Sequence, residues 1–239
     1  MNEPAPVLDL KPVLDLNDVR YRWPGRASFE LHVPNLTLAQ GETVLLLGES
    51  GSGKSTLLSL ICGTIVAQSG AVRVAGTDIS SLSSGNRDRF RAEQIGLIFQ
   101  QFNLLPFASV QDNILLPLRF APDRAKRVAS HTDEAARLCG DLGLPRDVMS
   151  KRAGTLSVGQ QQRVAAARAL IGTPPLIVAD EPTSSLDAAT QTAFLDVLFA
   201  QSRSHSTAVL MVSHDARLAD QFDRVIKMAD IAKTARGIA

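Results

Sequence analysis

The sequence has no uninterrupted apolar run of about 18 residues, the shortest that crosses a bilayer as a helix, so we expect the chain not to span a membrane. Its first residues, Met1–Pro4, lack the basic start and long apolar stretch of a secretory signal peptide, and we expect no signal peptide. Charge is nearly balanced, at a formal net charge of +1. Charge therefore indicates neither nucleic acid nor an acidic protein as a partner.

Cysteine and large aromatic residues are also scarce. The two cysteines, Cys62 and Cys139, lie far apart in apolar helical stretches, which predicts buried thiols rather than a disulfide. One Trp, one Tyr and nine Phe provide no obvious stacking platform for single-stranded nucleic acid. A length of 239 residues, 45% of them hydrophobic, predicts one large domain or one domain with a subdomain.

What the sequence does contain is a glycine-rich turn between an apolar strand, Val44–Leu47, and an apolar helix, Ser55–Cys62. The turn has the P-loop pattern Gly-x-x-x-x-Gly-Lys-Ser. Its glycines let backbone N–H groups approach phosphate oxygens, Lys54 neutralises the β and γ oxygens, and the Ser55 hydroxyl is a ligand for Mg²⁺. A flexible Gly/Ser linker would not be flanked by a strand and a helix. The predicted ATP contacts here are Gly48, Glu49, Ser50, Gly51, Ser52, Gly53, Lys54, Ser55 and Thr56.

Before this turn, apolar and polar residues alternate, which predicts a small antiparallel sheet. The pentapeptide Pro-Val-Leu-Asp-Leu occurs at 6–10 and again at 12–16, so the first strand has two possible registers. We favour the second copy, because the alternation continues from it to Trp23. Residues 1–12 are predicted to be a tail, whose copy of the repeat either pairs as an extra edge segment or stays mobile. A turn is expected at Pro24-Gly25.

After the turn, strands and helices alternate, which predicts a mostly parallel sheet. Strands are expected at 94–99, 175–181 and 207–212. The stretch from Val110 to about Leu142 has a helical pattern and indicates a helical insertion in an α/β domain. Ligands bind such sheets beyond the carboxyl ends of the strands. Besides the P-loop, the residues predicted at that edge are Gln100, Asp180, Glu181 and His214.

Two adjacent carboxylates at the end of a buried strand suggest chemistry. Asp180 is predicted to hold Mg²⁺ through water, and Glu181 to polarise the water that attacks the γ-phosphate. A solvated strand end is the alternative. His214 is predicted to hydrogen-bond the γ-phosphate and orient that water, although a lone histidine is more often structural. Gln100 is a candidate ligand for Mg²⁺ or the water, and an ordinary polar residue before a loop remains an open interpretation.

In this order, these segments resemble the ATP-binding subunits of ABC transporters. The matching segments are Gln100 (Q-loop), Leu156–Gln160 (signature), Leu176–Pro182 (Walker B), Ser184–Asp187 (D-loop) and His214 (H-loop). The resemblance extends from about Leu14 to Met228. It implies a P-loop NTPase (RecA-like) α/β core, an N-terminal antiparallel β subdomain and an inserted α-helical subdomain. The ABC ATPase domain would span 13–239, with 13–88 and 160–239 as the core and 89–159 as the helical subdomain that carries the Q-loop and signature.

The resemblance also implies an ATPase that works as a pair of chains. Two copies would pack head to tail, with each ATP and its Mg²⁺ between the P-loop of one and the signature of the other. The signature residues are Ser157, Val158, Gly159 and Gln160, and Asp187 would lie at the seam. The signature usually reads Leu-Ser-Gly-Gly-Gln, and Val158 stands at the third position. This departure matters because valine disfavours positive φ and adds bulk near the phosphate. We expect a competent site with altered turnover; if the valine prevents close approach, hydrolysis would be slow.

Two aromatic residues are candidates for stacking on adenine. The family places an aromatic ring on the N-terminal sheet, and Trp23, which precedes Pro-Gly, matches that position best. Tyr21 is the second candidate, and a core or edge position is its alternative.

The loop after Gln100 carries apolar side chains at Phe102, Leu104 and Leu105. It resembles the segment that receives a coupling helix from integral membrane permease subunits; the alternative is that these side chains fold back onto the helical insertion as core. Together with Glu181–Ser184, this segment most resembles lipoprotein-releasing, macrolide-exporter and cell-division ATPases. That implies export, extraction or mechanotransmission from the cytoplasmic face of the inner membrane.

Two other functions are alternatives to this one. A regulatory ATPase module would signal through a membrane protein without substrate transport, and the sequence barely separates it from a transporter subunit. A soluble ATPase of DNA repair or translation needs a long heptad insertion or tandem cassettes, and the sequence has neither.

Overall fold

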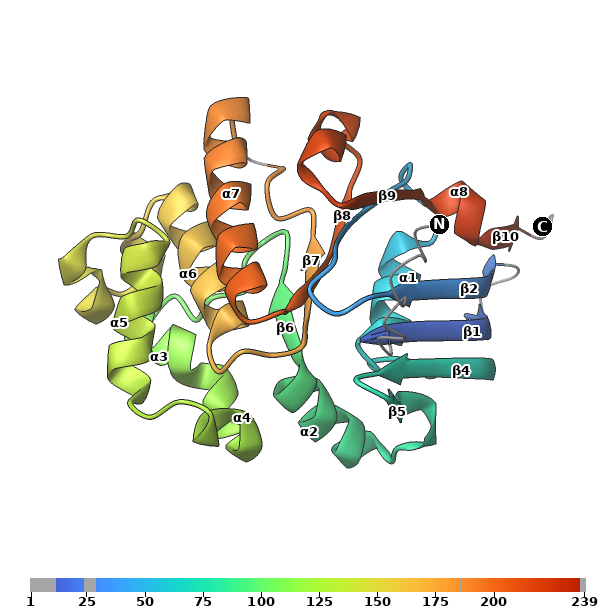
Figure 1. Cartoon of the computed structure of the whole chain (residues 1–239), viewed down its shortest axis with the longest axis horizontal. Helices are drawn as coiled ribbons and strands as arrows, with labels where there is room; N and C mark the ends of the chain where they lie inside the picture. The colour runs from blue at the N-terminus through green and yellow to red at the C-terminus, as the bar shows by residue number, and fades with distance from the viewer. Residues whose placement is uncertain (1–11, 24–28, 185, 237–239) are drawn as a thin grey trace, which may run out of the picture.

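Two sheets of five strands each form the framework of the chain (Figure 1). The computed structural model describes residues 12–23, 29–184 and 186–236. An antiparallel sheet has the order β10-β2-β1-β4-β5, and a parallel sheet has the order β6-β7-β8-β3-β9. The antiparallel strands are β1 (Leu14–Arg22), β2 (Phe29–Leu38), β4 (Ser69–Val74), β5 (Thr77–Asp78) and β10 (Lys233–Arg236). The parallel strands are β3 (Thr43–Leu47), β6 (Ile95–Ile98), β7 (Leu176–Asp180), β8 (Ala208–Ser213) and β9 (Arg224–Lys227). The predicted fold class is confirmed.

The first strand uses the second copy of the repeated pentapeptide, as predicted. Leu14 pairs with Leu38 of β2 on one side and with Val74 of β4 on the other. The first copy and the Pro24-Gly25 turn lie outside the described residues.

Helices flank the parallel sheet and fill the predicted insertion. Those outside the insertion are α1 (Lys54–Ile61), η1 (Ile79–Ser81), α2 (Ser84–Gln94), α6 (Val158–Leu170), α7 (Ala188–Ser204), η5 (Ala216–Gln221) and α8 (Met228–Ile231). Those inside it are α3 (Val110–Leu115), η2 (Leu116–Arg119), α4 (Pro122–Lys126), α5 (His131–Asp141), η3 (Arg146–Ser150) and η4 (Ala153–Thr155).

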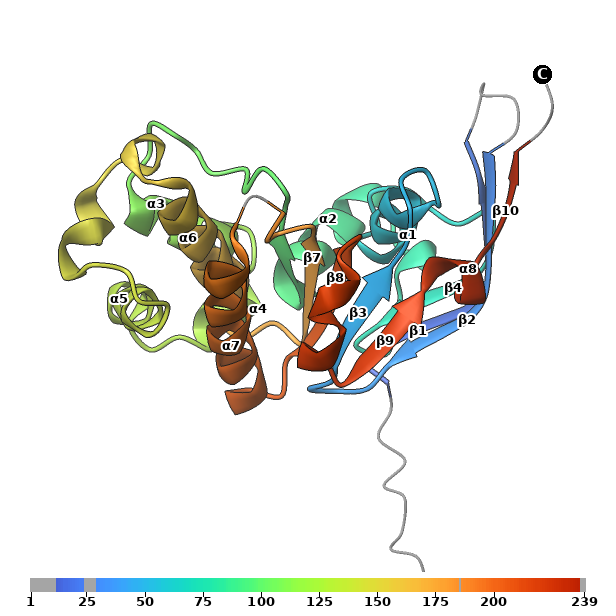
Figure 2. The same ribbon diagram turned by 90° about the horizontal axis from the view of Figure 1, so that it is seen from above.

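The insertion is helical but broken into short pieces. Pro117 and Pro122 lie in the first turns of η2 and α4, where proline is tolerated, and neither could continue a preceding helix. Figures 1 and 2 show the helices of the insertion at one end of the molecule and the antiparallel sheet at the other. Although β6 falls within 89–159, it belongs to the parallel sheet. The division into subdomains stays a prediction.

β3, β6, β7 and β8 are almost wholly buried, which explains their continuous apolar runs, whereas the edge strand β9 exposes Val225 and Lys227. Alternate side chains belong to two separate cores. Leu45 and Val209 pack in the core that contains α6, α7 and the insertion. Leu46 and Leu210 pack in the core that joins α1 to the antiparallel sheet. At about 1.5–3 kcal/mol for each large side chain buried, these cores fix the strands whose ends carry the predicted site.

Both cysteines are free and buried, as predicted. Burial raises the pKa of Cys62 to about 12 and that of Cys139 to about 11. Their thiols are therefore protonated at neutral pH. In the described part of the chain, no helix is both long and apolar enough to cross a bilayer.

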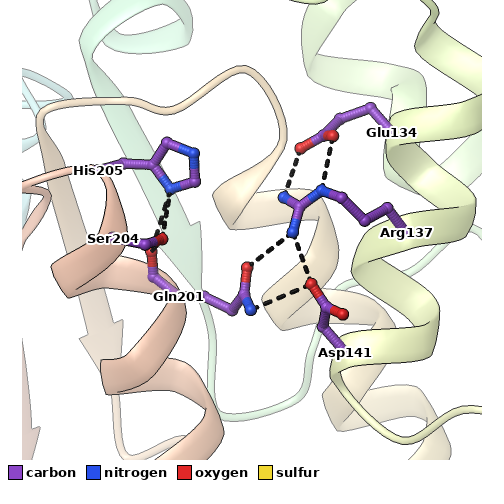
Figure 3. Close-up of polar contacts among 6 residues, drawn as sticks. All are labelled: Glu134, Arg137, Asp141, Gln201, Ser204 and His205. Atoms are coloured by element: carbon purple, nitrogen blue, oxygen red, sulfur yellow. Dashed lines mark hydrogen bonds and ion pairs between the residues drawn. The ribbon is translucent and has the colours of Figure 1, made fainter.

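A polar cluster links the insertion to α7 (Figure 3). The Arg137 guanidinium donates to Glu134 and Asp141 on α5, and to Gln201 Oε1 on α7 at 3.2 Å. The Gln201 amide donates back to Asp141 at 3.1 Å. The hydrogen bond with Glu134 raises the pKa of Arg137. α5 and α7 therefore share one apolar core and are also joined directly by hydrogen bonds.

Candidate functional site

The glycine-rich turn connects β3 to α1 and encloses the side chain of Lys54. Gly51 and Gly53 have φ values of 77° and 100°, which residues with a Cβ rarely adopt. Lys54 is 9% exposed, and its ammonium donates to the carbonyls of Gly48 and Glu49 at 2.6 and 2.7 Å. The first N–H groups of α1 add a partial positive charge at the same place. The turn therefore concentrates donors and positive charge, as an anion site requires.

This turn borders a cavity of about 880 Å³. The cavity brings together residues from six separate segments of the chain. They are Trp23, Phe29, Glu49, Ser50, Gly51, Gly53, Lys54, Ser55, Thr56, Gln100, Asp180, Glu181 and His214. Two predicted contacts, Gly48 and Ser52, do not line it. The Gly48 carbonyl accepts from Lys54, and Ser52 Oγ is buried with no hydrogen-bond partner among the described residues.

The parallel sheet explains why distant residues meet here. β6, β7, β8 and β3 are successive neighbours, so their carboxyl ends lie along one edge. Gln100 comes shortly after β6, Asp180 ends β7 and His214 follows β8. The edge predicted from sequence is thus the edge that the cavity occupies.

Glu181 and His214 contact each other directly. Glu181 Oε2 lies 3.0 Å from His214 Nδ1. The Glu181 backbone has a φ of 44°, in the left-handed region, and its N–H donates to Val212 O at 3.0 Å. Such a backbone costs about 1–3 kcal/mol and is found most often at functional sites. The neighbouring strand β8 therefore holds Glu181 both by its backbone and, through His214, by its carboxylate.

Asp180 is suited to holding a cation. Burial raises the pKa of Asp180, the charge of Glu181 raises it further, and Lys54 opposes the shift. A divalent cation would relieve the cost of the ionised carboxylate. The Ser55 hydroxyl, the Asp180 carboxylate and the Gln100 amide are oxygen donors of the kind that Mg²⁺ takes. The described residues contain no cluster of three His, Cys, Asp or Glu side chains that could hold a metal, so hydroxyl, amide, water or phosphate oxygens would complete the shell.

Of the two aromatic candidates, Trp23 is the one at the cavity. Its ring is 37% exposed, and its Nε1 donates to Thr56 Oγ1 at 3.2 Å. Tyr21 is 8% exposed and contacts the Trp23 ring edge-on, with 5.3 Å between the ring centres. The alternative interpretation of Tyr21, a core residue, therefore holds.

The signature segment caps α6 and lies outside this cavity. Ser157 Oγ accepts from the Gln160 N–H at 3.4 Å, and Gln160 Oε1 accepts from the Ser157 N–H at 3.1 Å. Val158 is the first residue of α6, has no positive φ and is 51% exposed. The expected conflict between valine and a positive φ is therefore wrong. Neither Gly159 nor its neighbours from 156 to 160 line the cavity of their own chain.

Asp187 has a local role in the single chain. Its carboxylate accepts from the Thr190 N–H at 3.0 Å and from the Thr190 hydroxyl at 2.7 Å, which caps the start of α7. These hydrogen bonds lower the pKa of Asp187.

The apolar loop after Gln100 is largely internal. Phe102 is 6% exposed and belongs to the core that contains the insertion, and Leu104 packs against that core. Leu105 is half-buried, and its N–H donates to Asn113 Oδ1 at 2.7 Å. The alternative interpretation therefore holds for Phe102, whose ring is not an exposed docking surface.

Exposed apolar surface lies nearby instead. A groove of about 540 Å³ runs between α2, β6 and η2. Its apolar lining includes Leu97, Phe99, Leu116, Pro117 and Phe120, and the Phe120 ring is 64% exposed.

Two residues of α6 that were not predicted from the sequence contact the segments that follow site strands. Gln162 Nε2 donates to Pro182 O at 3.0 Å, directly after Glu181. Arg168 donates to the carbonyls of Phe102 and Asn103, shortly after Gln100. The available signal was a polar side chain within an alanine-rich run that is otherwise buried.

Comparison with known proteins agrees with this geometry. Residues 31–184 match the family model described as ABC transporter. The lipoprotein-releasing system ATP-binding protein LolD of Novosphingobium aromaticivorans is 40% identical over 220 residues, which cover 91% of this chain and 96% of LolD. The macrolide export ATP-binding/permease protein MacB of Rhodopirellula baltica is 39% identical over 82% of this chain, and the chain spans only 28% of the length of MacB.

A solved structure has the same fold. The dimeric ATP-binding cassette MJ0796, in a post-hydrolysis state with ADP and Pi, superposes with a TM-score of 0.76 at 31% identity. The match covers 94% of this chain and all of that one. The predicted resemblance to lipoprotein-releasing and macrolide-exporter ATPases is confirmed by these relatives. Because the family model matches more than half of the chain, the protein belongs to the ABC transporter family and is an ATP-binding, ATP-hydrolysing subunit of that family.

Proposed function

We propose that two copies of this chain pack head to tail around two ATP molecules, and that hydrolysis opens the pair and drives an integral membrane partner. One observation carries this proposal. The cavity contains the P-loop, the carboxylates and His214, but the capped start of α6 lies outside it. A nucleotide bound to one chain would thus lack the signature until a second chain supplies it. The dimeric state of the MJ0796 cassette supports this arrangement.

Within one chain, the cavity residues bind and orient the nucleotide. The P-loop N–H groups and Lys54 hold the phosphates through charge-assisted hydrogen bonds. Trp23 stacks on the adenine. Ser55 and Gln100, together with Asp180 through water, would hold Mg²⁺, which would supply positive charge against the phosphates.

Glu181 is the general base. It accepts a proton from water while the water oxygen bonds to the γ-phosphorus, and the bond to the bridging oxygen of ADP breaks. His214 fixes the carboxylate through the 3.0 Å contact and orients the same water. The products are ADP and phosphate.

The second chain completes each site. The start of α6 directs its free N–H groups and Ser157 at the γ-phosphate of the partner, with Gly159 and Gln160 beside it. Asp187 lies at the seam while it caps α7. Val158 projects from the helix surface. Its bulk therefore affects how closely the two chains approach, rather than straining the backbone of its own chain.

The membrane partner docks in the groove beside the loop after Gln100. A 540 Å³ apolar groove with an exposed Phe120 fits a short apolar segment of a permease subunit. The name of the MacB relative joins ATP-binding and permease parts in one protein. We therefore place the chain at the cytoplasmic face of the inner membrane, where it powers export, extraction or mechanotransmission.

A mixture of two inactive variants tests the head-to-tail arrangement. Lys54→Ala removes the P-loop cation, and Ser157→Arg blocks the signature. A mixed dimer contains one doubly defective site and one intact site. With random pairing, the mixture is expected to recover about a quarter of wild-type ATPase activity, because half of the dimers are mixed and each has one intact site. A mixture as inactive as its components, with no ATP-dependent dimer by light scattering, would contradict the arrangement.

A further inference from the structure

The loop after Gln100 contains two consecutive residues in an unfavourable backbone conformation. Phe102 and Asn103 have φ values of 59° and 48°. Residues with a Cβ seldom adopt the left-handed region, and two in succession are rarer still. Gln100, two residues before this pair, lines the nucleotide cavity. Whatever holds the pair therefore also fixes the direction in which Gln100 leaves β6.

The guanidinium of Arg168 holds this pair. Nη1 donates to Asn103 O at 2.7 Å, and Nη2 donates to Phe102 O at 2.5 Å. Arg168 is 8% exposed, and burial lowers its pKa. The guanidinium reaches the two carbonyls from two different nitrogens held in one rigid plane, whereas a lysine offers a single nitrogen with no fixed plane and so orients the two carbonyls less strictly.

The other hydrogen bonds of this turn are local. Phe102 N donates to Phe99 O at 2.9 Å, and Asn103 N donates to Gln101 O at 2.7 Å. They shape the turn. The Phe102 ring packs in the core and Leu105 hydrogen-bonds to Asn113 of α3, but the carbonyls of the left-handed pair itself are bound by Arg168 of α6, whose other end carries the signature.

We propose that Arg168 is a positioning residue for Gln100. It clamps the left-handed pair, and so holds the Gln100 amide where it reaches the Mg²⁺–nucleotide. This inference rests on the proposed function, because it requires Gln100 to act at the nucleotide. It adds a residue that lies on the signature helix and does not line the cavity.

The test compares Arg168→Lys with Arg124→Lys in the full-length chain. Arg124 is a matched control: it is 1% exposed, and its guanidinium donates to backbone carbonyls, those of Ile171, Ala169, Ala92 and Ile95. None of these belongs to the loop after Gln100. Arg124 and Arg168 both line the apolar groove, so both variants are assayed without a membrane partner. If Arg124→Lys does not fold, Arg137→Lys replaces it, since Arg137 also links the insertion to the core.

The first readout is amide hydrogen exchange over residues 99–105, measured without nucleotide. Arg168→Lys is expected to speed exchange there by about tenfold or more, while the control leaves these amides unchanged. This readout needs no ATPase activity. Equal exchange in both variants would overturn the clamp.

The second readout is steady-state ATPase activity as a function of Mg²⁺ and ATP. Arg168→Lys is expected to lower kcat by about 10- to 100-fold, as a small misplacement at a reacting centre does, and to raise the Mg²⁺ concentration needed for half-maximal rate. The control is expected to keep kcat within about twofold of wild type.

A double variant decides whether the effect passes through Gln100. In a Gln100→Ala background, Arg168→Lys is expected to lower kcat no further, because the positioned amide is already absent. Additive losses would overturn the positioning role. If the wild-type chain has no ATPase activity, the proposed function is wrong instead. Hydrogen exchange, which needs no activity, would still show whether Arg168 holds the loop after Gln100.

Discussion

Replacing Glu181 with glutamine tests the proposed chemistry most directly. The amide has the shape of the carboxylate and can keep a hydrogen bond to His214 across the 3.0 Å contact. Its backbone bond to Val212 is unaffected. What is lost is the ability to accept a proton from water. A positioned general base contributes about 10²- to 10⁴-fold to rate.

At about 1.36 kcal/mol for each factor of ten, this loss corresponds to about 2.7–5.5 kcal/mol in the activation free energy. We therefore expect kcat for phosphate release to fall by about 10²- to 10⁴-fold. ATP affinity, measured with a fluorescent nucleotide, is expected to stay within about threefold, since the P-loop contacts are intact. The variant should also accumulate as an ATP-bound dimer in light scattering.

Glu42→Gln is the matched control. Glu42 pairs with Arg224 at 2.6 Å, immediately before β3 begins and away from the cavity. It is expected to keep wild-type turnover. If Glu181→Gln hydrolyses ATP at the wild-type rate, Glu181 is not the base. If it loses ATP binding as well as turnover, the carboxylate acts in binding rather than in proton transfer.

Three other substitutions probe separate parts of the site. Because burial raises the pKa of Asp180 above its unfolded value, this carboxyl destabilises the fold increasingly as pH rises above the unfolded pKa, and by its full amount once pH exceeds the folded-state pKa. Asp180→Asn should therefore raise the melting temperature of the nucleotide-free chain at neutral pH, and this gain should shrink toward about pH 4. The same variant should lose Mg²⁺-dependent turnover. A melting temperature below that of the wild type at pH 7 would refute this reasoning. Trp23→Ala should weaken ATP binding about 5- to 150-fold in titrations, which is the contribution of one stacked base, and Trp23→Phe should retain most of the affinity. If Trp23→Ala binds ATP as tightly as the wild type, Trp23 does not stack on the adenine. Val158→Gly should lower the free energy of unfolding, measured with urea, by at most about 1 kcal/mol, since Val158 is an exposed residue in the first turn of α6. It should raise ATPase turnover, because the smaller residue lets the partner chain approach more closely. Slower turnover would show that valine favours the approach.

Most of the cavity could be predicted from sequence because its signals are local. The P-loop is a contiguous pattern, and Asp180, Glu181 and His214 each lie at the end of a short apolar run, rich in β-branched residues, that is typical of a buried strand. The carboxyl ends of parallel strands share an edge, so recognising the strands was enough to bring these residues together.

Other features depend on tertiary contacts that no local pattern reveals. β9 and β10 are four residues each, too short for a periodic signal, and β10 forms only by pairing with β2. The loop that contains Phe102 has apolar side chains, which were interpreted from the sequence either as a docking surface or as core. The left-handed backbone at Phe102 directs its ring into the core. Arg168 was not singled out from the sequence, because the carbonyls that it binds lie 65 and 66 residues earlier in the chain.

α6 explains how events in one cavity could reach the other. Its start, capped by Ser157 and Gln160, is proposed to meet the phosphate of the partner chain. Along the same helix, Gln162 holds the carbonyl after Glu181, and Arg168 holds the loop after Gln100. Thirteen residues in continuous helix span about 20 Å and move as one body. A shift of the start of α6 when the partner's phosphate leaves would therefore displace both strand ends of its own cavity. The two sites would be coupled by a single helix in each chain, without any further contact between the cavities.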